Sequence, residues 1–394
     1  MKKWLMLVLF SSLSFAESLD VLIKQLQTQN PLLQERREAI MIEDEKSKLS
    51  QSWDNPYLTL GVNDLLLDDI TARDVEPMQT QYIMLSQKIP MGDKLALQKN
   101  IALLKRDIAH SNYHDKVDSL ISKLTSHAHK VAILDKKIAL IVNFQNNVKK
   151  LTRLHKKRFE VGVGTQSEIE KTKILSKKLK IKKRKFQTMK RDFLWKIEKL
   201  TFSKVAGIET SLILDKAQDI NISILPIMIS KNLQVQKAKQ ILALKQEKTT
   251  SDIKVGFGYF QREDRSDYLS LNVGMPLPLR GKEQSAIKVA MLEHKQAELS
   301  RKNLLFSLQR ERDMYQSLMQ DAKENHAIIK QEILPKQRYI HKLLKQEVFT
   351  KNSSITQLLE NLNDSILLEL EALDAVWSYF DAYAKLVYLQ GGIS

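Results

Sequence analysis

Histidines and methionines are the residues of this chain whose types and spacing could support metal chemistry. His110 and His114 lie four residues apart, a spacing that lets two imidazoles on one helical face bind a metal ion. The chain also has 12 methionines, and thioethers favour Cu(I). However, the chain has no cysteine, the carboxylates do not cluster, and His127 and His129 do not share a helical face. We therefore expect no metal site, and interpret the histidines as surface residues and the methionines as packing residues.

No motif for covalent or acid–base chemistry accompanies them. The sequence has no Gly-rich phosphate loop, no Ser/His/Asp arrangement and no nucleophile motif. We therefore expect no enzyme activity and no cofactor.

The N-terminal segment MKKWLMLVLFSSLSFA, residues 1–16, has the pattern of a signal peptide. Two lysines precede an apolar run at 4–10, and the small residues Ser14 and Ala16 have the spacing that a signal peptidase prefers. We expect cleavage after Ala16. No later run approaches the ~18 apolar residues of a membrane helix. An exported chain without cysteine is held together by packing alone.

Basic residues are concentrated in one segment. The chain carries a net charge of +17, and residues 149–200 contain 19 Lys and Arg against 5 Asp and Glu. Such a run is compatible with nucleic acid, which an exported protein seldom meets. We interpret it as a solvated helix face, with an acidic partner or phosphate-rich lipid headgroups as the alternatives.

The same order of elements is predicted twice. In each half a helix that starts at a proline, Pro31 or Pro226, precedes two strands, a long helix, a turn and another long helix. The loop between the strands is longer in the first half, as expected when one loop of a duplicated chain changes length. The predicted domains are the signal peptide 1–16, a first repeat 17–202 (strands 56–63 and 80–90, tip near 161–166), a connector 203–224, and a second repeat 225–394 (strands 253–261 and 268–278, tip near 348–354).

The predicted strands alternate between apolar and small or polar residues. In 253–261, Phe257 and Tyr259 share one face and Gly256 and Gly258 share the other. Strands of roughly 9 to 11 residues can cross an outer membrane within a tilted barrel, but four strands are too few to close one. Several chains therefore share a barrel, or the sheet packs on another element.

The helices carry heptad repeats typical of coiled coils. The helix expected from about 93 to 160 would reach roughly 100 Å, and we expect Pro335 to kink or interrupt the corresponding helix of the second half. Gly162 and Gly164, in RFEVGVGTQSEIEKTK (158–173), let the chain reverse where a residue with positive φ is needed. Trp195 and Trp377 are interpreted as packing residues near helix ends. The heptad positions after the second turn are Ile355, Leu359, Leu362, Ile366, Leu370, Leu373, Trp377, Phe380, Ala384 and Val387.

Taken together, the signal peptide, Asn30-Pro31, the two strand pairs and the tip sequence resemble the TolC family of outer-membrane efflux channels, over essentially the whole mature chain. The segment NVGMPLPLRGKEQSAIKVA, 272–290, is similar to the branch that exports heavy-metal cations (CzcC-like and CusC-like). The resemblance implies an all-α dominated fold with a small β part. Long antiparallel coiled-coil hairpins would form an α-barrel, and four strands per chain would contribute to a trimeric 12-stranded transmembrane β-barrel.

The resemblance also implies a function and partners. The chain would be the exit duct of a tripartite efflux pump in the bacterial outer membrane, with its helical part in the periplasm and metal cations as the expected cargo. Its partners would be two further copies of itself, a periplasmic adaptor (membrane fusion) protein, an RND-type inner-membrane transporter and outer-membrane lipid, but no nucleic acid.

Two sets of site residues follow from the same resemblance. Two gate positions of the family match Gln357 and Glu360, of which only Glu360 is charged, and three symmetric Glu360 carboxylates would attract cations at a constriction. The tip match is good at 158–170 and poorer at 348–360, where Lys351 replaces the glycine. The implied adaptor-contact residues are Val161, Gly162, Val163, Gly164 and Thr165 in the first tip and Lys351, Asn352, Ser353 and Ser354 in the second.

The residues alone leave another class of protein open. A secreted or periplasmic coiled-coil scaffold or adhesin could bind an acidic surface through its basic helices. Its soluble sheet should bury Leu58, Val255 and Leu271 against a helix of the same chain, whereas a barrel would turn them to lipid. The periplasmic adaptor of such a pump also has a long helical hairpin, but only one, with a lipoyl-like β domain that this chain lacks.

Overall fold

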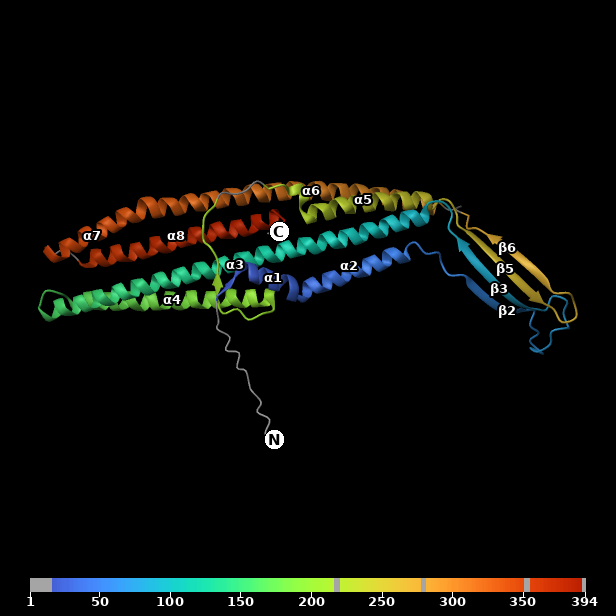
Figure 1. Ribbon diagram of the computed structural model, residues 1–394, viewed down its shortest axis with the longest axis horizontal. Helices are drawn as coiled ribbons and strands as arrows, with labels where there is room; N and C mark the ends of the chain where they lie inside the picture. Colours follow the sequence, from blue (N-terminus) through green and yellow to red (C-terminus); the bar gives the residue numbers. More distant parts are fainter. Residues whose placement is uncertain (1–15, 216–219, 278–280, 351–354, 392–394) are drawn as a thin grey trace, which may run out of the picture. The chain divides into compact units, whose positions relative to one another are not determined.

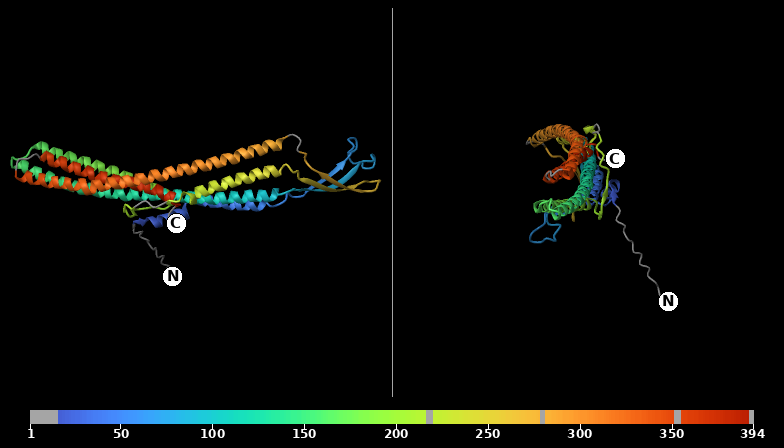
Figure 2. Two further views of the ribbon diagram at one scale, coloured as in Figure 1. Left: turned by 90° about the horizontal axis from the view of Figure 1, so that it is seen from above. Right: turned by 90° about the vertical axis from the view of Figure 1, so that its left-hand side faces the viewer.

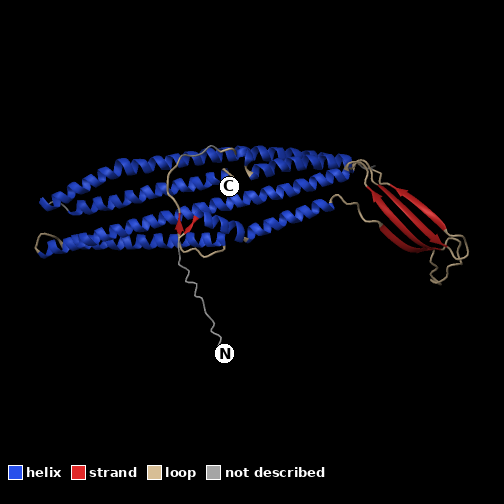
Figure 3. Ribbon diagram, in the orientation of Figure 1, coloured by secondary structure: helices blue, strands red, loops and turns tan. Residues whose placement is uncertain are grey.

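The structure is a computed structural model that describes residues 16–215, 220–277, 281–350 and 355–391 (Figure 1). Most of these residues are helical, and the main sheet has four strands (Figure 3). In chain order the elements are β1 (Glu17–Ser18), α1 (Leu19–Gln29), α2 (Pro31–Leu49), β2 (Tyr57–Asn63), β3 (Thr80–Ile89), α3 (Lys94–Glu160), α4 (Gln166–Thr201), β4 (Ile208–Glu209), η1 (Ile222–Ile224), α5 (Pro226–Glu247), β5 (Ile253–Gln261), β6 (Tyr268–Gly274), α6 (Lys282–Ala327), η2 (Ile328–Ile333), α7 (Leu334–Thr350) and α8 (Ile355–Leu389).

The chain divides into two compact units that do not coincide with the two predicted repeats. One unit contains residues 1–34, 114–225 and 306–394, and will be called the hairpin unit. The other contains residues 35–113 and 226–305, and will be called the sheet unit. Each unit takes segments from both halves of the chain, so the duplication and its boundaries stay a prediction. The predicted signal peptide lies outside the described residues except for Ala16.

The sheet unit is organised around an antiparallel sheet with the strand order β2-β3-β5-β6 (Figure 1). Each half of the chain contributes one hairpin, and the central β3–β5 pairing joins them, with Tyr82 opposite Phe260 and Lys88 opposite Lys254. The strand predicted for 268–278 ends early, at Gly274. Pro276 has no N–H to donate to a ladder, which explains the early end; Pro278 lies outside the described residues.

The two faces of this sheet differ as the alternation predicted. On one face large apolar side chains are exposed: Leu58 is 56% and Leu271 is 71% exposed, and Val255 is half-buried. The other face carries glycine, serine, threonine and asparagine, plus a stack in which the ring of Phe260 lies 5.0 Å from that of Tyr82 and 4.9 Å from that of Tyr268. The exposed apolar residues are Leu58, Leu60, Ile83, Leu85, Phe257, Tyr259, Leu269, Leu271 and Val273.

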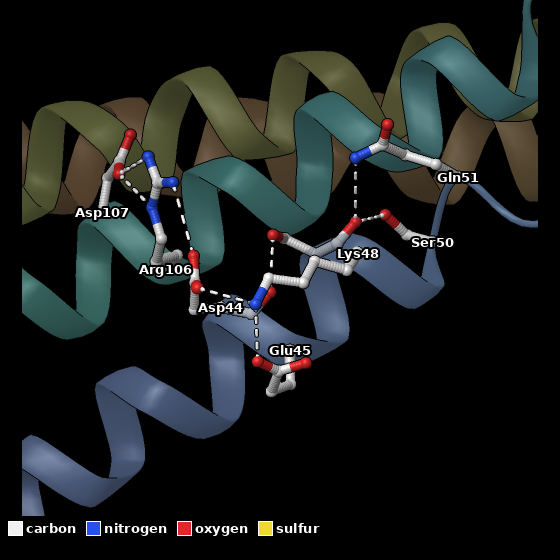
Figure 4. Close-up of polar contacts among 8 residues, drawn as sticks. Asp44, Glu45, Lys48, Ser50, Gln51, Arg106 and Asp107 are labelled. Carbon is white, nitrogen blue, oxygen red and sulfur yellow. Dashed lines mark hydrogen bonds and ion pairs between the residues drawn. The ribbon is translucent and has the colours of Figure 1, made fainter.

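Polar contacts tie the helices of the sheet unit together. Asp44 of α2 lies between two cations, with Arg106 of α3 at 3.7 Å and Lys48 at 3.6 Å (Figure 4). Arg106 also pairs with Asp107 at 2.9 Å. These are exposed pairs, so each contributes only about 0–1 kcal/mol; they orient α2 on α3 more than they stabilise it.

The hairpin unit consists of long helices that run antiparallel in pairs (Figure 2). Lys190 of α4 pairs with Asp135 of α3 at 2.6 Å, and Lys330 of η2 pairs with Glu369 of α8 at 2.5 Å. Side chains of α3, α4 and α8 meet in one apolar cluster, and its three members from α8 are positions of the predicted heptad repeat. Its buried members are Ile141, Val148, Leu179, Leu362, Ile366 and Leu370.

Pro335 interrupts the α-helical pattern, as predicted, but does so without ending the helix. The six residues before Leu334 form a π-helical segment, in which the Leu334 N–H donates to the carbonyl of Ile329, five residues earlier. Proline lacks the N–H that an α-helix needs and its ring crowds the carbonyl four residues back. A π-segment lets the chain accommodate this without a break.

Candidate functional site

Residues 161–165 connect α3 to α4 and form the first hairpin tip. The Val163 N–H donates to the Arg158 carbonyl at 2.9 Å, and the Gly162 N–H donates to the Phe159 carbonyl at 3.0 Å. This bonding is the Schellman motif, which needs a left-handed residue directly after the helix. Gly162 fills that position with φ +75°, as predicted.

Gly164 is required for a different reason from the predicted one, because its φ is not positive. A Cβ at this position would lie 3.1 Å from the backbone nitrogen of Phe159 and 3.3 Å from the carbonyl carbon of Arg158. Those atoms belong to the end of α3 and cannot rotate away. The second glycine is therefore needed for close approach of the backbone, and only the first for its dihedral angle.

A capping box fixes the start of α4. The Thr165 hydroxyl accepts the Glu168 N–H at 3.3 Å, and the Glu168 carboxylate accepts the Thr165 N–H at 3.1 Å. Between the two helices Val161 and Val163 are exposed, at 72% and 57%. The tip thus presents two apolar side chains on a backbone fixed at both ends.

The second tip falls in a gap of the structure. α7 ends at Thr350 and α8 begins at Ile355, so Lys351, Asn352, Ser353 and Ser354 lie outside the described residues. Beyond the tip the two helices are joined by polar contacts, such as the amide of Gln337 donating to the Asn361 carbonyl at 3.2 Å.

The predicted gate residues Gln357 and Glu360 are both exposed on the first turns of α8. Glu360 does not stand alone electrostatically. It lines a cavity of about 340 Å³ together with Lys171 and Lys178 of α4. Those ammonium groups oppose the negative potential that three symmetric Glu360 carboxylates would create.

A buried histidine lies behind the first tip, and sequence reasoning missed it. His155 is 1% exposed, and in the described part of the chain neither ring nitrogen has a hydrogen-bond partner. Its Nδ1 is 3.9 Å from the Glu168 carboxylate, which is too long for a hydrogen bond. Burial lowers the pKa of His155, and the nearby Glu168 carboxylate only partly offsets this. No local pattern distinguishes this histidine, because its burial depends on the return of α4.

Lysine–aromatic contacts hold α3, α4 and α8 together deeper in the hairpin unit. Lys130 pairs with Asp381 at 2.5 Å, and its ammonium lies 5.3 Å from the centroid of the Trp377 ring. Lys137 pairs with Asp374, and its ammonium lies 5.4 Å from the centroid of the Trp377 ring. Trp377 is therefore a packing residue, as predicted. The prediction was wrong for Trp195, which is exposed because it lies two residues from the buried Ile197 and so on the opposite side of α4.

Asp118 is a buried carboxylate near Asp115, which accepts a hydrogen bond from the Tyr388 hydroxyl at 2.7 Å. Burial, with repulsion from Asp115, raises the pKa of Asp118 from 3.8 to about 6. The folded state therefore binds this proton more tightly than the unfolded state does. The resulting destabilisation is absent below about pH 4, grows from pH 4 to 6, and is complete above pH 6.

We expect Asp118→Asn to stabilise the protein by up to about 3 kcal/mol at pH 7.5 and by little near pH 4, since asparagine is neutral throughout. Thermal unfolding followed by circular dichroism at both pH values measures this. Asp192→Asn, which changes an exposed carboxylate paired with Lys196, is the matched control. Equal stabilisation by Asp118→Asn at both pH values would contradict the assignment.

The histidines that were considered as metal ligands do not form a metal site in the described part of the chain. His110 and His114 are exposed, as predicted, but His129 and His155 are buried, which corrects the interpretation of the histidines as surface residues. The His129 ring stacks on Phe380 with 4.0 Å between centroids. Within the described ranges, no three or more His, Cys, Asp or Glu side chains come together in a way that would hold a metal ion. Across those same ranges, none of the helices combines the length and the apolar character needed to traverse a bilayer.

No protein-family model and no curated protein matches the sequence, but solved structures match the fold. The structure of CusC, from a study of its folding and transmembrane channel formation, superposes with a TM-score of 0.82 at 11% identity, covering 95% of this chain and 92% of that one. The CmeC outer-membrane channel of Campylobacter jejuni gives 0.77 at 12% identity, with 95% and 85% covered. The outer-membrane protein VceC of Vibrio cholerae gives 0.80 at 12% identity, with 95% and 96% covered.

These similarities establish the class of fold. The chain has the fold of TolC-like outer-membrane channels, mostly helical with a small antiparallel sheet, which confirms the predicted fold class. CusC forms a transmembrane channel, CmeC is an outer-membrane channel and VceC is an outer-membrane protein, and at 11% to 12% identity the similarity establishes only the fold.

Proposed function

We propose that this protein is an outer-membrane channel that forms the exit duct of an efflux pump and assembles as a homotrimer. The observation that carries the proposal is the sheet of the sheet unit. Its strand order leaves one edge of β2 and one edge of β6 unpaired within the described chain. Unpaired edges must be covered or joined in a membrane, and three such sheets joined edge to edge give a closed barrel of 12 strands.

The exposed apolar face supports the same proposal. A soluble scaffold was expected to bury Leu58 and Leu271 against a helix. Both side chains are more than half exposed. A contiguous apolar sheet face of this kind promotes aggregation in water, whereas the outward face of a membrane barrel has to be apolar. This observation disfavours the scaffold or adhesin alternative.

The partners are proposed from the resemblance to the TolC family. The first tip, with Val161 and Val163 exposed on a fixed turn, is proposed as the contact for a periplasmic adaptor protein, which would link the channel to an RND-type inner-membrane transporter. The second tip, 351–354, is proposed to contribute in the same way. Gln357 and Glu360 are proposed to line the periplasmic mouth, where the neighbouring lysines of α4 weaken the expected attraction for cations.

Metal cations as the cargo stay a prediction from the resemblance. The described residues supply no cluster of metal ligands that favours it, and the charges described in the next section favour another class of cargo.

Cell fractionation tests the proposal, with outer-membrane material run unboiled and boiled on a gel. We expect the protein in the outer membrane as a trimer that dissociates on boiling. A soluble monomer or dimer in the periplasm or the medium would exclude a barrel and return the scaffold to consideration.

A further inference from the structure

Two lysines face each other across the central strand pair of the sheet. Lys88 of β3 and Lys254 of β5 are register partners on the face that carries the small and polar residues. Like charges directly opposite each other destabilise a sheet. Lys88 is compensated by Asp252 at 3.2 Å and Asp54 at 3.8 Å. Among the described residues no carboxylate lies within ion-pair distance of Lys254, whose ammonium lies 5.9 Å from the centroid of the Tyr57 ring.

More lysines surround a cavity of about 580 Å³ where these strands meet the helices of the sheet unit. Lys88 lines this cavity, so the cavity opens on the polar side of the sheet. Lys94, which is 5% exposed, donates to Asp252 and to the Thr250 carbonyl, both at 2.5 Å. The remaining lining lysines, Lys245, Lys248 and Lys282, have no ion-pair partner in the described part of the chain.

The carboxylates of the cavity do not balance these charges. Its acidic lining residues are Asp54, Asp252 and Glu283, and the first two already contact Lys88 or Lys94. Only Glu283 remains to offset Lys254, Lys245, Lys248 and Lys282, none of which has an ion-pair partner in the described part of the chain, and we call these four residues the lysine cluster. Its charge lies within one small region of a single unit.

Local structure explains only part of the cluster. Lys245 and Lys248 lie at the C-terminal end of α5, where cations interact favourably with the helix dipole. Lys282 is the first residue of α6, where a cation is unfavourable. Lys254 opposes another lysine. Residues that break local rules without a compensating contact are expected at functional positions.

Whether these lysines contact lipid or line the lumen depends on the face of the sheet on which they lie. If the apolar face of a barrel contacts lipid, its polar face lines the lumen, as in water-filled barrels generally. This step rests on the proposed function. Lys254 lies on that face, and the other three members of the cluster surround the cavity that Lys88 of the same face lines. In a threefold assembly the lysine cluster would then recur three times around the lumen.

We propose that the lysine cluster makes this lumen selective for anions, so that the cargo of the channel is anionic rather than a metal cation. Rings of cationic side chains favour anions in pores, and a confined passage lined by one sign of charge concentrates ions of the other sign. The effect acts within about 10 Å in 0.1 M salt but only about 3 Å in 1 M salt.

Single-channel recording tests this inference with potassium chloride as the probe. The purified trimer is inserted into a planar bilayer of neutral lipid, and the reversal potential is measured under a salt gradient. We expect a chloride-over-potassium permeability ratio above about 3 at low salt, which falls toward about 1 in 1 M salt. The double variant Lys254→Gln/Lys282→Gln removes two of the four charges of the cluster and should lower the low-salt ratio toward about 1. Lys24→Gln, the same charge change on the exposed face of α1, should leave it unchanged.

The outcomes separate the inference from the proposed function. A wild-type channel that prefers potassium, or a ratio that is the same in the double variant, would overturn the anion inference and leave the channel intact. A trimer that forms no conducting pore would overturn the proposed function and the inference with it. Unboiled gels confirm assembly of each variant, and if the double variant does not assemble, Lys282→Gln alone should lower the ratio, since Lys282 is exposed at a helix start.

Discussion

The double variant Gly162→Leu/Gly164→Leu is expected to reach the outer membrane as a trimer and to lose transport. Leucine at Gly162 would occupy a left-handed conformation at a cost of about 1–2 kcal/mol, although the space around it is open. Leucine at Gly164 would meet the backbone of Phe159 at 3.1 Å. Both changes act on the turn that positions Val161 and Val163, so the tip should lose its shape while the helices behind it persist.

Complementation of a deletion strain measures this effect. The double variant should leave the strain as susceptible as the deletion itself to compounds whose toxicity the deletion increases. Gly391→Leu is the matched control, because Gly391 also has a positive φ, of 85°, and open space around it, but follows the end of α8. It should complement fully. If the tip variant fails to form trimers, the turn serves folding and the assignment of the tip as a docking site is wrong.

Truncation of one core side chain should have the largest effect on stability. Ile366 is 2% exposed and lies in the cluster where α3, α4 and α8 meet. Ile366→Ala removes buried methyl and methylene groups and leaves a cavity. The three long helices pack against one another along their lengths, so they cannot move together to fill it. We expect a loss of about 2–5 kcal/mol in the free energy of unfolding, measured by denaturant unfolding of the purified protein.

Two further substitutions calibrate that result. Ile366→Val removes one methylene group and should cost about 0.5–1.5 kcal/mol. Leu367→Ala changes the next residue of α8, which is exposed, and should cost no more than about 0.5 kcal/mol. Similar losses at positions 366 and 367 would mean that the cluster is not the core of the hairpin unit.

The features that the sequence predicted well are those encoded within a few residues of each other. The apolar alternation of β5 and the four-three spacing through Leu362, Ile366 and Leu370 are local patterns, and both appear in the structure. The role of Gly162 was also predictable, because a glycine directly after a helical run fits the helix C-terminus.

What the sequence did not predict depends on segments that are distant along the chain. Gly164 matters through a backbone contact, not through its own dihedral angle. His155 is buried only because α4 returns past it, and the lysine cluster forms only where the α5–β5 and β6–α6 connections meet. Trp195 was misassigned because the sequence does not say which side of an isolated helix meets its neighbours.

The pairing of β3 with β5 also constrains the order in which the chain can fold. β3 lies in the first half of the chain and β5 in the second, so the central ladder cannot form until the chain is complete through β5. Until then β2 and β3 have only each other, and an isolated two-stranded hairpin is at best marginally stable in water. Its apolar face would be open to aggregation throughout that interval. If the chain is exported as proposed, its folding should therefore be helped by a periplasmic chaperone that holds the unpaired hairpin, and should be slow because the decisive contacts are non-local.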